Sequence, residues 1–399
     1  MSELLVQGAT SYSAGLFVLP LQAEFHISRA DANSPVLILF FGAALVSPFV
    51  GKFIDRFPVR LVMSLGAAIF SLSLIGIASS ASLRVMALIL VLPCAIGFMS
   101  IGPLTTAAMA ARWFYRRRGL ALGLAAVATS GGGFIVVPML SRAIQIHGWR
   151  LGLIYEAIAM AIIIIILTLL VLRDNPVDLG LGEHPENQGR PATASHSTDR
   201  NAGNRPALPW QEILGSRAFW IPSLVLATVS GTSQALVVTL VPYAIGMHVA
   251  ATSAALLISA FAISAAVTKV SAGILADYVN QRLLLIAAAL FMTLSWLTLT
   301  LFAGYWALFA SSCMGGIALG CALPTAAALI AARFGSAKFG AVMGWTYALI
   351  AAFAILATRF IGALYDSLGG YHYAFMIFSL ILAGLLVGTL LVVPERRTT

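Results

Sequence analysis

Two basic residues stand inside long apolar stretches, where a charge is costly. Lys269 lies eight residues before Asp277, and Arg359 lies seven residues before Asp366. A cation buried in a membrane span costs about 2.5–3.5 kcal/mol on insertion scales, and it normally faces an aqueous path and a partner. A transported anion would be a fitting partner, so Lys269 is the first candidate for a substrate-binding residue. Snorkelling toward the membrane surface, or pairing with an acid on another helix, are the alternatives.

Arg359 is the second candidate. At 1.5 Å per residue, Lys269 lies about 12 Å from one end of its span and Arg359 about 10 Å from the opposite end of its own. Across a hydrocarbon core of about 30 Å, the two differ in depth by roughly 8 Å, which their side chains and one carboxylate can bridge. A gating role, or pairing with Asp366, is the equal alternative for Arg359.

Other polar residues in apolar stretches could complete such a site. Tyr12 and Gln234 hold equivalent positions in the two halves of the chain, and each lies in a polar patch. Hydroxyl and amide donors can bind a carboxylate without adding charge, and hydrogen bonding between helices is the equal alternative. Glu156 is a candidate proton carrier, with pairing to Arg142 or Arg150 as its alternative.

Composition defines the surroundings of these residues. The chain has 399 residues, of which 60% are hydrophobic and only 9% charged, whereas about a quarter are charged in soluble proteins. Its mean hydropathy is +0.97, so it is an integral membrane protein. Runs of roughly 20 apolar residues can cross the hydrocarbon core. They predict an all-α fold of twelve transmembrane helices, at 3–22, 32–53, 60–80, 84–111, 119–144, 151–172, 217–246, 251–276, 282–302, 305–332, 339–364 and 373–394.

One long polar gap separates six of these spans from the other six. It is rich in Pro, Gly, Asn, Ser and His and has no apolar periodicity, which is typical of a flexible linker. Its last part, 209–217, is predicted to form a short helix at the membrane surface. We therefore predict an N-terminal six-helix bundle at 1–172, a linker at 173–216 and a C-terminal six-helix bundle at 217–399.

Basic residues fall mostly on one side of the predicted membrane. Apart from the two within spans, most of the 23 Lys and Arg follow spans 2, 4, 6, 8 and 10 or lie at the C-terminus, and the opposite side has Arg29, Arg84, Arg142 and Arg150. The positive-inside rule then places the linker and both termini in the cytoplasm. The net charge of +9 reflects this topology, and no nucleic-acid partner is expected, because the basic residues sit in short gaps.

Two further expectations concern the chain start and the cysteines. The first span begins almost at Met1 without a basic anchor, so we expect the native N-terminus to lie upstream. Cys94, Cys313 and Cys321 lie in apolar runs without paired spacing. No metal, disulfide or cofactor is expected.

A charged stretch in the first half, GKFIDRFPVR, recurs in weaker form in the second half as GILADYVNQR. At a constant offset of 222 in the numbering, Gly51 matches Gly273, Asp55 matches Asp277, and Arg60 matches Arg282. At an offset of 221, further matches are Pro103 with Pro324, Arg112 with Arg333, Gly119 with Gly340, and Gly123 with Gly344. The near-constant offset predicts two pseudo-symmetric bundles, a transporter arrangement with the substrate site between them near the midplane.

The candidate gating residues are Gly51, Asp55, Arg56, Arg60 and Asp277. Asp55 can pair with basic groups or cap a neighbouring helix N-terminus, and so hold the halves together at the cytoplasmic side. Each partly exposed ion pair contributes only about 0–1 kcal/mol, which is weak enough to open. Tyr278 replaces the arginine in the second copy, so the sequence supports a latch at Asp277 less than one at Asp55. A charge cluster that only sets topology is the alternative.

The first of these stretches resembles the loop 2-3 signature of the major facilitator superfamily. Five more resemble the bacterial monocarboxylate and oxalate/formate porters along nearly the whole chain: SYSAGLFVLPLQAEF from Ser11, ARWFYRRRGLALGLA from Ala111, HGWR from His147, RDNPVDLGL from Arg173 and GALYDSLGGYHYAF from Gly362. The resemblance implies a secondary active transporter of small carboxylates in the cell inner membrane that works by alternating access. Related porters carry a basic residue in span 8, usually Arg, where this chain has Lys269.

Departures from the resemblance leave proton coupling open. Eukaryotic monocarboxylate porters pair an acid and an arginine four residues apart in span 8, whereas Ala265 precedes Lys269 here. Their span 1 lysine has no counterpart, and oxalate-type relatives place their second cation where this chain has residues 347–351. Symport with a proton and antiport of one anion for another both remain.

The expected partners are a small anionic substrate, a proton in the case of symport, and membrane lipid, with the protein a monomer. Efflux of amphipathic or aromatic compounds is the alternative function, since 22 Phe and 12 Met could line an adaptable cavity. An enzyme is not expected, because the histidines near the span ends, His26, His147, His248 and His372, form no ligand motif.

Overall fold

The computed structural model of the chain describes residues 1–32, 34–114, 117–173, 210–335 and 338–391, and within them the regular structure is helical. The first part comprises α1 (Ser2–Gln7), the π-helical turn η1 (Gly8–Tyr12), α2 (Ala14–Phe25), α3 (Arg29–Ala32), α4 (Ser34–Arg56), α5 (Val59–Ser79), α6 (Leu83–Ile89), the π-helical turn η2 (Leu90–Cys94), α7 (Ala95–Ile101), α8 (Pro103–Trp113) and α9 (Arg118–Leu170). The second comprises α10 (Trp210–Gly215), α11 (Arg217–Gly246), α12 (Ala251–Tyr278), α13 (Gln281–Leu301), α14 (Tyr305–Phe334), α15 (Phe339–Leu368) and α16 (His372–Leu391). The all-α prediction is confirmed.

Eleven helical segments of the described chain are long and apolar enough to cross a membrane. One of them is part of α9, which contains a break at Gly148, where φ is 81° and ψ is 164°. This break lies between predicted spans 119–144 and 151–172, so the two parts of α9 account for both. The prediction of twelve spans is confirmed.

The fourth span differs from its prediction because it is not one regular helix. Pro93 lies within the π-helical turn η2, and Gly102, with φ −93° and ψ −149°, separates α7 from α8 just before Pro103. Proline has no backbone N–H to donate, and its ring clashes with the preceding turn. The apolar run 84–111 therefore contains two interruptions that hydropathy alone does not show.

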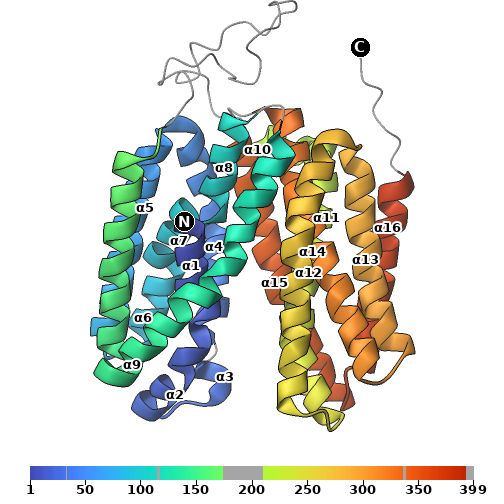
Figure 1. The fold of residues 1–399 in the computed structure, drawn as a ribbon, viewed down its shortest axis with the longest axis horizontal. Coiled ribbons are helices and arrows are strands. Elements are labelled where there is room, and N and C mark those ends of the chain that lie inside the picture. The colour runs from blue at the N-terminus through green and yellow to red at the C-terminus, as the bar shows by residue number, and fades with distance from the viewer. Residues whose placement is uncertain (33, 115–116, 174–209, 336–337, 392–399) are drawn as a thin grey trace, which may run out of the picture.

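Buried apolar side chains form two cores, one mainly from α1 to α9 and one from α11 to α16. Phe70 and Leu104 lie in the first core, and Trp296 and Phe375 in the second. Figure 1 shows the two groups of helices side by side, with α15 between them. The short helix predicted in 209–217 is present as α10. The domain boundaries at 172 and 216 stay a prediction.

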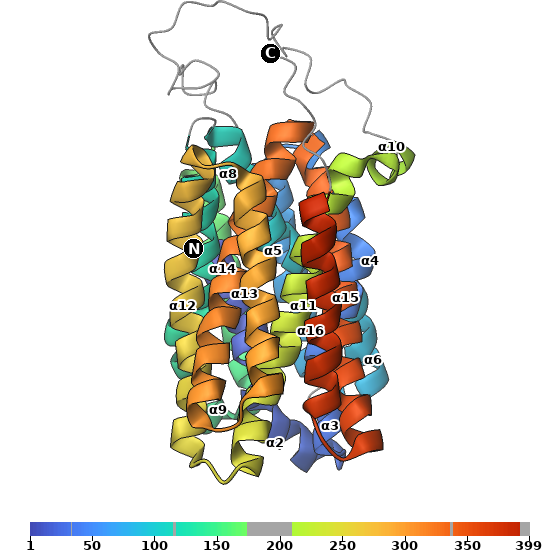
Figure 2. The same ribbon diagram turned by 90° about the vertical axis from the view of Figure 1, so that its right-hand side faces the viewer.

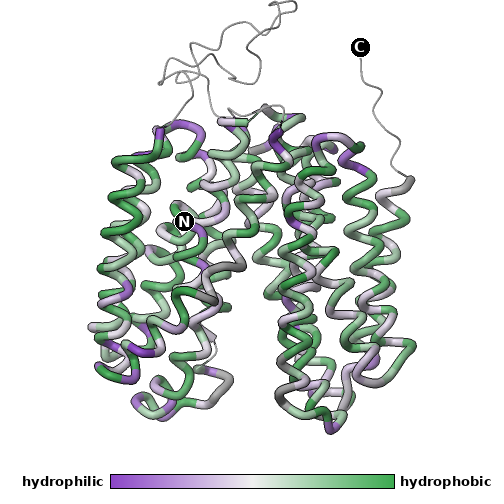
Figure 3. The backbone as a smooth tube through the Cα atoms, in the orientation of Figure 1, coloured by the Kyte–Doolittle hydropathy of each residue, from purple (hydrophilic) through white to green (hydrophobic). Residues whose placement is uncertain are grey.

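We call the end of the bundle where α9 finishes and α10 begins the linker end. The helices of the two halves lie closest there and diverge toward the opposite end, near α2 and α3 (Figure 1). The helices of the second half run side by side along one axis (Figure 2). Hydrophilic residues gather near both ends of the bundle, and the middle is mostly hydrophobic (Figure 3), as a membrane-spanning bundle requires.

The break at Gly148 generates the first testable prediction. Its dihedral angles lie in a region that is essentially restricted to glycine, where another residue costs of the order of 1–3 kcal/mol. Gly148→Ala is expected to lower the melting temperature of the detergent-solubilised protein by several degrees. Gly384→Ala on α16 is the matched control, since nothing lies within 4 Å of the added methyl group. Equal melting temperatures for wild type and Gly148→Ala would contradict this account.

Candidate substrate site and the contacts that close it

The end of α4 meets the start of α15 through one carboxylate. Asp55 accepts hydrogen bonds from the backbone N–H groups of Gly340 and Ala341, at 2.8 and 2.7 Å. These N–H groups lie in the first turn of α15, where helix geometry provides no internal acceptor. A hydrogen bond to a charged group contributes about 1.5–3 kcal/mol. Asp55 therefore joins the two halves at the linker end by capping a helix, the second of its two predicted contacts.

The second copy of the motif makes the same contact in the opposite sense. Asp277, near the end of α12, accepts from the backbone N–H groups of Gly119 and Leu120 at 2.7 and 3.0 Å. These two residues lie in the first turn of α9. The missing arginine at Tyr278 does not prevent this contact, because helix capping needs only the carboxylate.

Glycines bring the helix backbones together at both crossings. A Cβ atom added to Gly51 would overlap the carbonyl oxygen of Gly340, and one added to Gly119 would overlap that of Gly273. No side chain fits at either position. The repeated glycines of the motif are therefore required for α4 to reach α15 and for α9 to reach α12.

The arginines of the motif bond within their own half. Arg60 donates to the carbonyl oxygen of Leu169 at the end of α9, and Arg282 donates to that of Thr389 near the end of α16, the latter at 2.8 Å. A basic residue satisfies carbonyls that a helix C-terminus leaves without internal donors. Arg56 is exposed and lies over the ring of Phe57, 5.7 Å from its centroid. The contact with Leu169 ties Arg60 to its own bundle, and its gating role between the halves stays a prediction.

Lys269 lies at the crossing of the two halves. Its side chain is only 7% exposed, and its ammonium donates to the carbonyl oxygen of Ala126 at 3.1 Å and to the hydroxyl of Thr129 at 2.6 Å. Both acceptors belong to α9, in the opposite half. In the repeat, the position of Lys269 on α12 corresponds to that of Ser47 on α4. Snorkelling does not describe this side chain, because it is buried between helices.

An acid that sequence reasoning missed acts on this lysine. Glu3 of α1 is 3% exposed and interacts electrostatically with Lys269 and with Tyr347 of α15. Pairing with an acid on another helix is one of the alternatives given above for Lys269, and Glu3 on α1 is such an acid. The available signal was an acid within the first apolar segment.

A small cavity of about 10 Å³ lies between the halves beside these groups. Its lining comes from α1, α8, α9, α14 and α15, and includes Glu3, Tyr347 and the repeat-related pair Pro103 and Pro324. This volume holds about one water molecule. The space is too small for a carboxylic acid in this conformation, so entry of a substrate requires the halves to move apart.

Arg359 is not brought to this cavity. It is exposed on α15, and among the described residues no ion pair joins it to Asp366 or to any other acid. By depth alone Arg359 and Lys269 lie within reach of one carboxylate, but the rotation of each helix about its axis decides whether their side chains face the same space. Direct contact of Arg359 with a substrate stays a prediction.

The polar patch of the first span forms a π-helical turn. The hydroxyls of Thr10 and Ser13 each donate to a backbone carbonyl four residues earlier, at 2.7 Å. Tyr12 closes this turn and is 46% exposed. Gln234, on α11, is half-buried. The small hydroxyls thus satisfy their own helix, while a lining role for Tyr12 and Gln234 stays a prediction.

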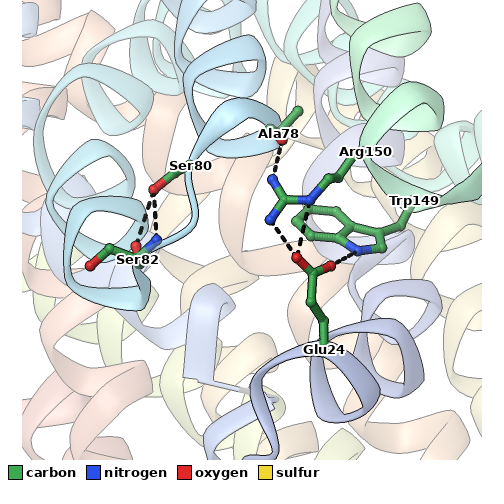
Figure 4. A network of polar contacts seen from close by, with 6 residues as sticks. All are labelled: Glu24, Ala78, Ser80, Ser82, Trp149 and Arg150. Carbon is green, nitrogen blue, oxygen red and sulfur yellow. Dashed lines mark hydrogen bonds and ion pairs between the residues drawn. The ribbon is translucent and has the colours of Figure 1, made fainter.

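Glu156 is buried in the second part of α9, and neither carboxylate oxygen has a hydrogen-bond partner among the described residues. Arg150, one of its two predicted partners, instead forms an ion pair with Glu24 at 2.5 Å. Glu24 also accepts from the indole N–H of Trp149 at 2.7 Å, and Arg150 donates to the carbonyl of Ala78. Figure 4 shows this network, which joins α2, α5 and α9 within the first half at the end opposite the linker.

A larger cavity, of about 520 Å³, lies within the first half. Its lining is mostly apolar and comes from η1, α2 to α6, η2 and α9, with Asp31 and Arg84 as its charged residues. None of its lining residues comes from the second half. It is therefore separate from the cavity beside Glu3.

Comparison with known proteins agrees with this architecture. A family profile described as the Major Facilitator Superfamily matches residues 2–250 and 224–399. The chain belongs to the Major Facilitator Superfamily. It is a secondary transporter and not an enzyme.

Solved structures support the fold. A Major Facilitator Superfamily transporter, FucP, in the outward conformation has a TM-score of 0.68 at 16% identity and covers 99% of this chain and 98% of its own. The proton:xylose symporter XylE bound to 6-bromo-6-deoxy-D-glucose has a TM-score of 0.72 at 16% identity, with 99% and 94% covered. These likenesses concern the fold alone.

Curated relatives match part of the chain. The uncharacterized MFS-type transporter YcxA of Bacillus subtilis is 31% identical over 153 residues, 37% of this chain and 38% of the relative. Monocarboxylate transporter 14 of Mus musculus is 30% identical over 150 residues, 37% of this chain and 28% of the relative. The oxalate:formate antiporter of Oxalobacter formigenes is 24% identical over 243 residues, 60% of this chain and 53% of the relative. Each match spans less than two thirds of the relative's length.

The paired aspartates lead to the second prediction. Asp55→Ala combined with Asp277→Ala removes four hydrogen bonds between the halves, so the linker end is expected to open more often. Spin labels on cysteines that replace Leu61 and Leu283, which are exposed and equivalent in the repeat, report the separation by pulsed electron paramagnetic resonance. The distance distribution is expected to shift to longer values.

Glu212→Ala, which removes an exposed acid of α10, is the control for the loss of a negative charge at the linker end. It is expected to leave the distribution unchanged. An unchanged distribution in the double aspartate variant would show that the two carboxylates do not hold the halves together.

Proposed function

We propose that this protein moves small carboxylates, among them monocarboxylates, oxalate and formate, across the cell inner membrane by alternating access. Lys269 is the electrostatic anchor, and the linker end faces the cytoplasm. The observation that carries this proposal is a buried cation at the crossing of the two halves, held by uncharged oxygens of α9.

The surroundings of Lys269 suit the capture of an anion. A carbonyl and a hydroxyl oxygen solvate an ammonium group without neutralising it, so a carboxylate can bind to the ammonium beside them. In a low-dielectric interior such a pair interacts more strongly than in water. The charge therefore selects anions over neutral compounds of the same size.

Position also supports the proposal. Lys269 lies eight residues, or about 12 Å, from Asp277 along α12, and so well inside the bundle from the linker end. In transporters of this architecture, substrates bind near the midplane at the interface of the repeats. Lys269 meets both conditions, because it reaches from the second half to α9 of the first.

The names of two relatives agree with a carboxylate substrate: an oxalate:formate antiporter and a monocarboxylate transporter. Efflux of amphipathic compounds receives less support. The cavity between the halves has neither Phe nor Met in its lining, whereas the larger apolar cavity lies within one half and not on a path that both halves share.

The third prediction concerns Lys269→Ala in purified protein reconstituted into liposomes. Uptake of labelled lactate, pyruvate, formate and oxalate is measured with and without a pH gradient and with and without internal anion. Loss of one charge-assisted hydrogen bond, worth about 1.5–3 kcal/mol, is expected to reduce carboxylate flux about tenfold to a hundredfold. Lys269→Arg keeps the charge and is expected to retain more flux than Lys269→Ala.

Lys52→Ala is the control, since Lys52 lies near the end of α4, and the chain has only three lysines. Carboxylate flux that is equal in wild type and Lys269→Ala would remove Lys269 from the site. Transport of aromatic or amphipathic compounds, with no flux of any of the four carboxylates, would favour efflux instead.

A further inference from the structure

Glu3 and Lys269 are opposite charges that reach the middle of the bundle from different halves. Glu3 belongs to α1 in the first half, and Lys269 to α12 in the second. Both are almost fully buried, at 3% and 7% exposure, and they interact electrostatically. A buried ionised carboxylate is stable only with a compensating charge or hydrogen bonds. Lys269 supplies that charge.

The position of Glu3 also puts it where a substrate would bind. Glu3 lines the small cavity between the halves, and Tyr347 lines it from α15. The Tyr347 hydroxyl is buried and has no hydrogen-bond partner among the described residues. A buried donor without an acceptor is costly, and a carboxylate placed in an enlarged cavity would supply the acceptor. Glu3 and Tyr347 thus line one cavity, and Lys269 donates to the carbonyl oxygen of Ala126, a residue that lines it too.

We propose that Glu3 is the proton-carrying residue of transport, and that its carboxylate and the substrate carboxylate compete for Lys269. This inference rests on the proposed function and adds the coupling ion and its residue. It selects symport of one proton with each monovalent anion over exchange of anions.

Charge balance gives the order of events. When Glu3 is ionised, it neutralises Lys269, and a second carboxylate would leave the site with a net negative charge in a low-dielectric interior. When one proton binds to Glu3, its O–H bond forms, the attraction to Lys269 ends, and the substrate carboxylate takes its place. After the halves have moved, the substrate leaves, Glu3 releases the proton, and its carboxylate pairs with Lys269 again. One proton and one anion have then crossed together.

Among the described residues, four groups are seen to act on Glu3. They are Lys269 on α12, Tyr347 on α15, the amino group of Met1 next to the same helix, and the uncharged hydroxyl of Thr106 on α8. Glu156, the acid predicted as proton carrier from the sequence, is absent from the lining of the cavity between the halves. Among the described residues no charged group pairs with it. Glu156 therefore has no cation for which a substrate could compete.

The experiment compares Glu3→Gln with wild type. Glutamine has the shape of protonated glutamate and cannot release a proton, so carboxylate binding should no longer depend on pH. Binding of lactate, pyruvate, formate and oxalate to purified protein is measured by calorimetry between about pH 6 and about pH 8. One bound proton per anion makes the wild-type Kd rise up to about tenfold per pH unit, whereas the Kd of Glu3→Gln should change less than about twofold.

Two matched variants and one further measurement complete the test. Glu156→Gln is expected to keep the wild-type pH dependence, and so is Glu3→Asp, which retains a titratable group. In weakly buffered solution, wild type is expected to take up about one proton per monovalent anion bound at the alkaline end of the range. This last measurement tests the proposal even if Glu3→Gln does not fold, as judged by size-exclusion chromatography.

Each result has one meaning. A pH dependence that survives in Glu3→Gln, or is lost in Glu156→Gln alone, overturns the role of Glu3 while carboxylate binding and the proposed function stand. Binding by wild type without proton uptake overturns it as well and leaves exchange as the mode of transport. Absence of binding of all four carboxylates to wild type overturns the proposed function itself.

Discussion

The contact between the halves depends on amide groups that a helix cannot satisfy internally. The first turns of α9 and α15 each present two such N–H groups to a carboxylate on the other half, from Asp277 and Asp55. These hydrogen bonds form only where the helix backbones lie close together, and the glycines at both crossings permit that close packing. Because the sequence repeats, each half supplies an equivalent aspartate, glycine and helix N-terminus. The pseudo-symmetry of the chain is thus expressed as two equal, reciprocal contacts at one end of the bundle.

Burial strengthens the electrostatic interactions of the charged side chains in the middle of the bundle. A lysine and a glutamate that would contribute little on a protein surface become the dominant charges in an interior with few other ionised groups. Lys269 is also solvated by Thr129 and Ala126, so it can exchange one anionic partner for another while retaining these uncharged ones. The arrangement favours a site where two carboxylates alternate over one where a single ion pair stabilises the fold.

Sequence periodicity and the constant offset predicted the all-α fold and the twelve spans, and they singled out Lys269 and Asp55 as candidates. These features follow from rules that act along the chain, namely span length and the cost of a buried charge. The partners could not be predicted in this way. Glu3, Thr129 and the amides of Gly119 meet their partners across the halves, and only the rotation of each helix about its axis decides such contacts. Similar depths in the membrane therefore suggested a shared site for Arg359 and Lys269, whereas the side chain of Arg359 is exposed in the structure.

The two crossing helices α9 and α12 carry both kinds of contact. The amides of Gly119 and the hydroxyl of Thr129 lie ten residues apart on α9, about 15 Å along one rigid rod, and Asp277 and Lys269 lie eight residues apart on α12. A rotation of one rod against the other cannot lengthen the outer contact without also shifting the inner one. The two helices cross at Gly123 and Gly273, so a rigid rotation of one against the other moves both contacts together. A passage open at both faces of the protein at once would require one of the two helices to bend.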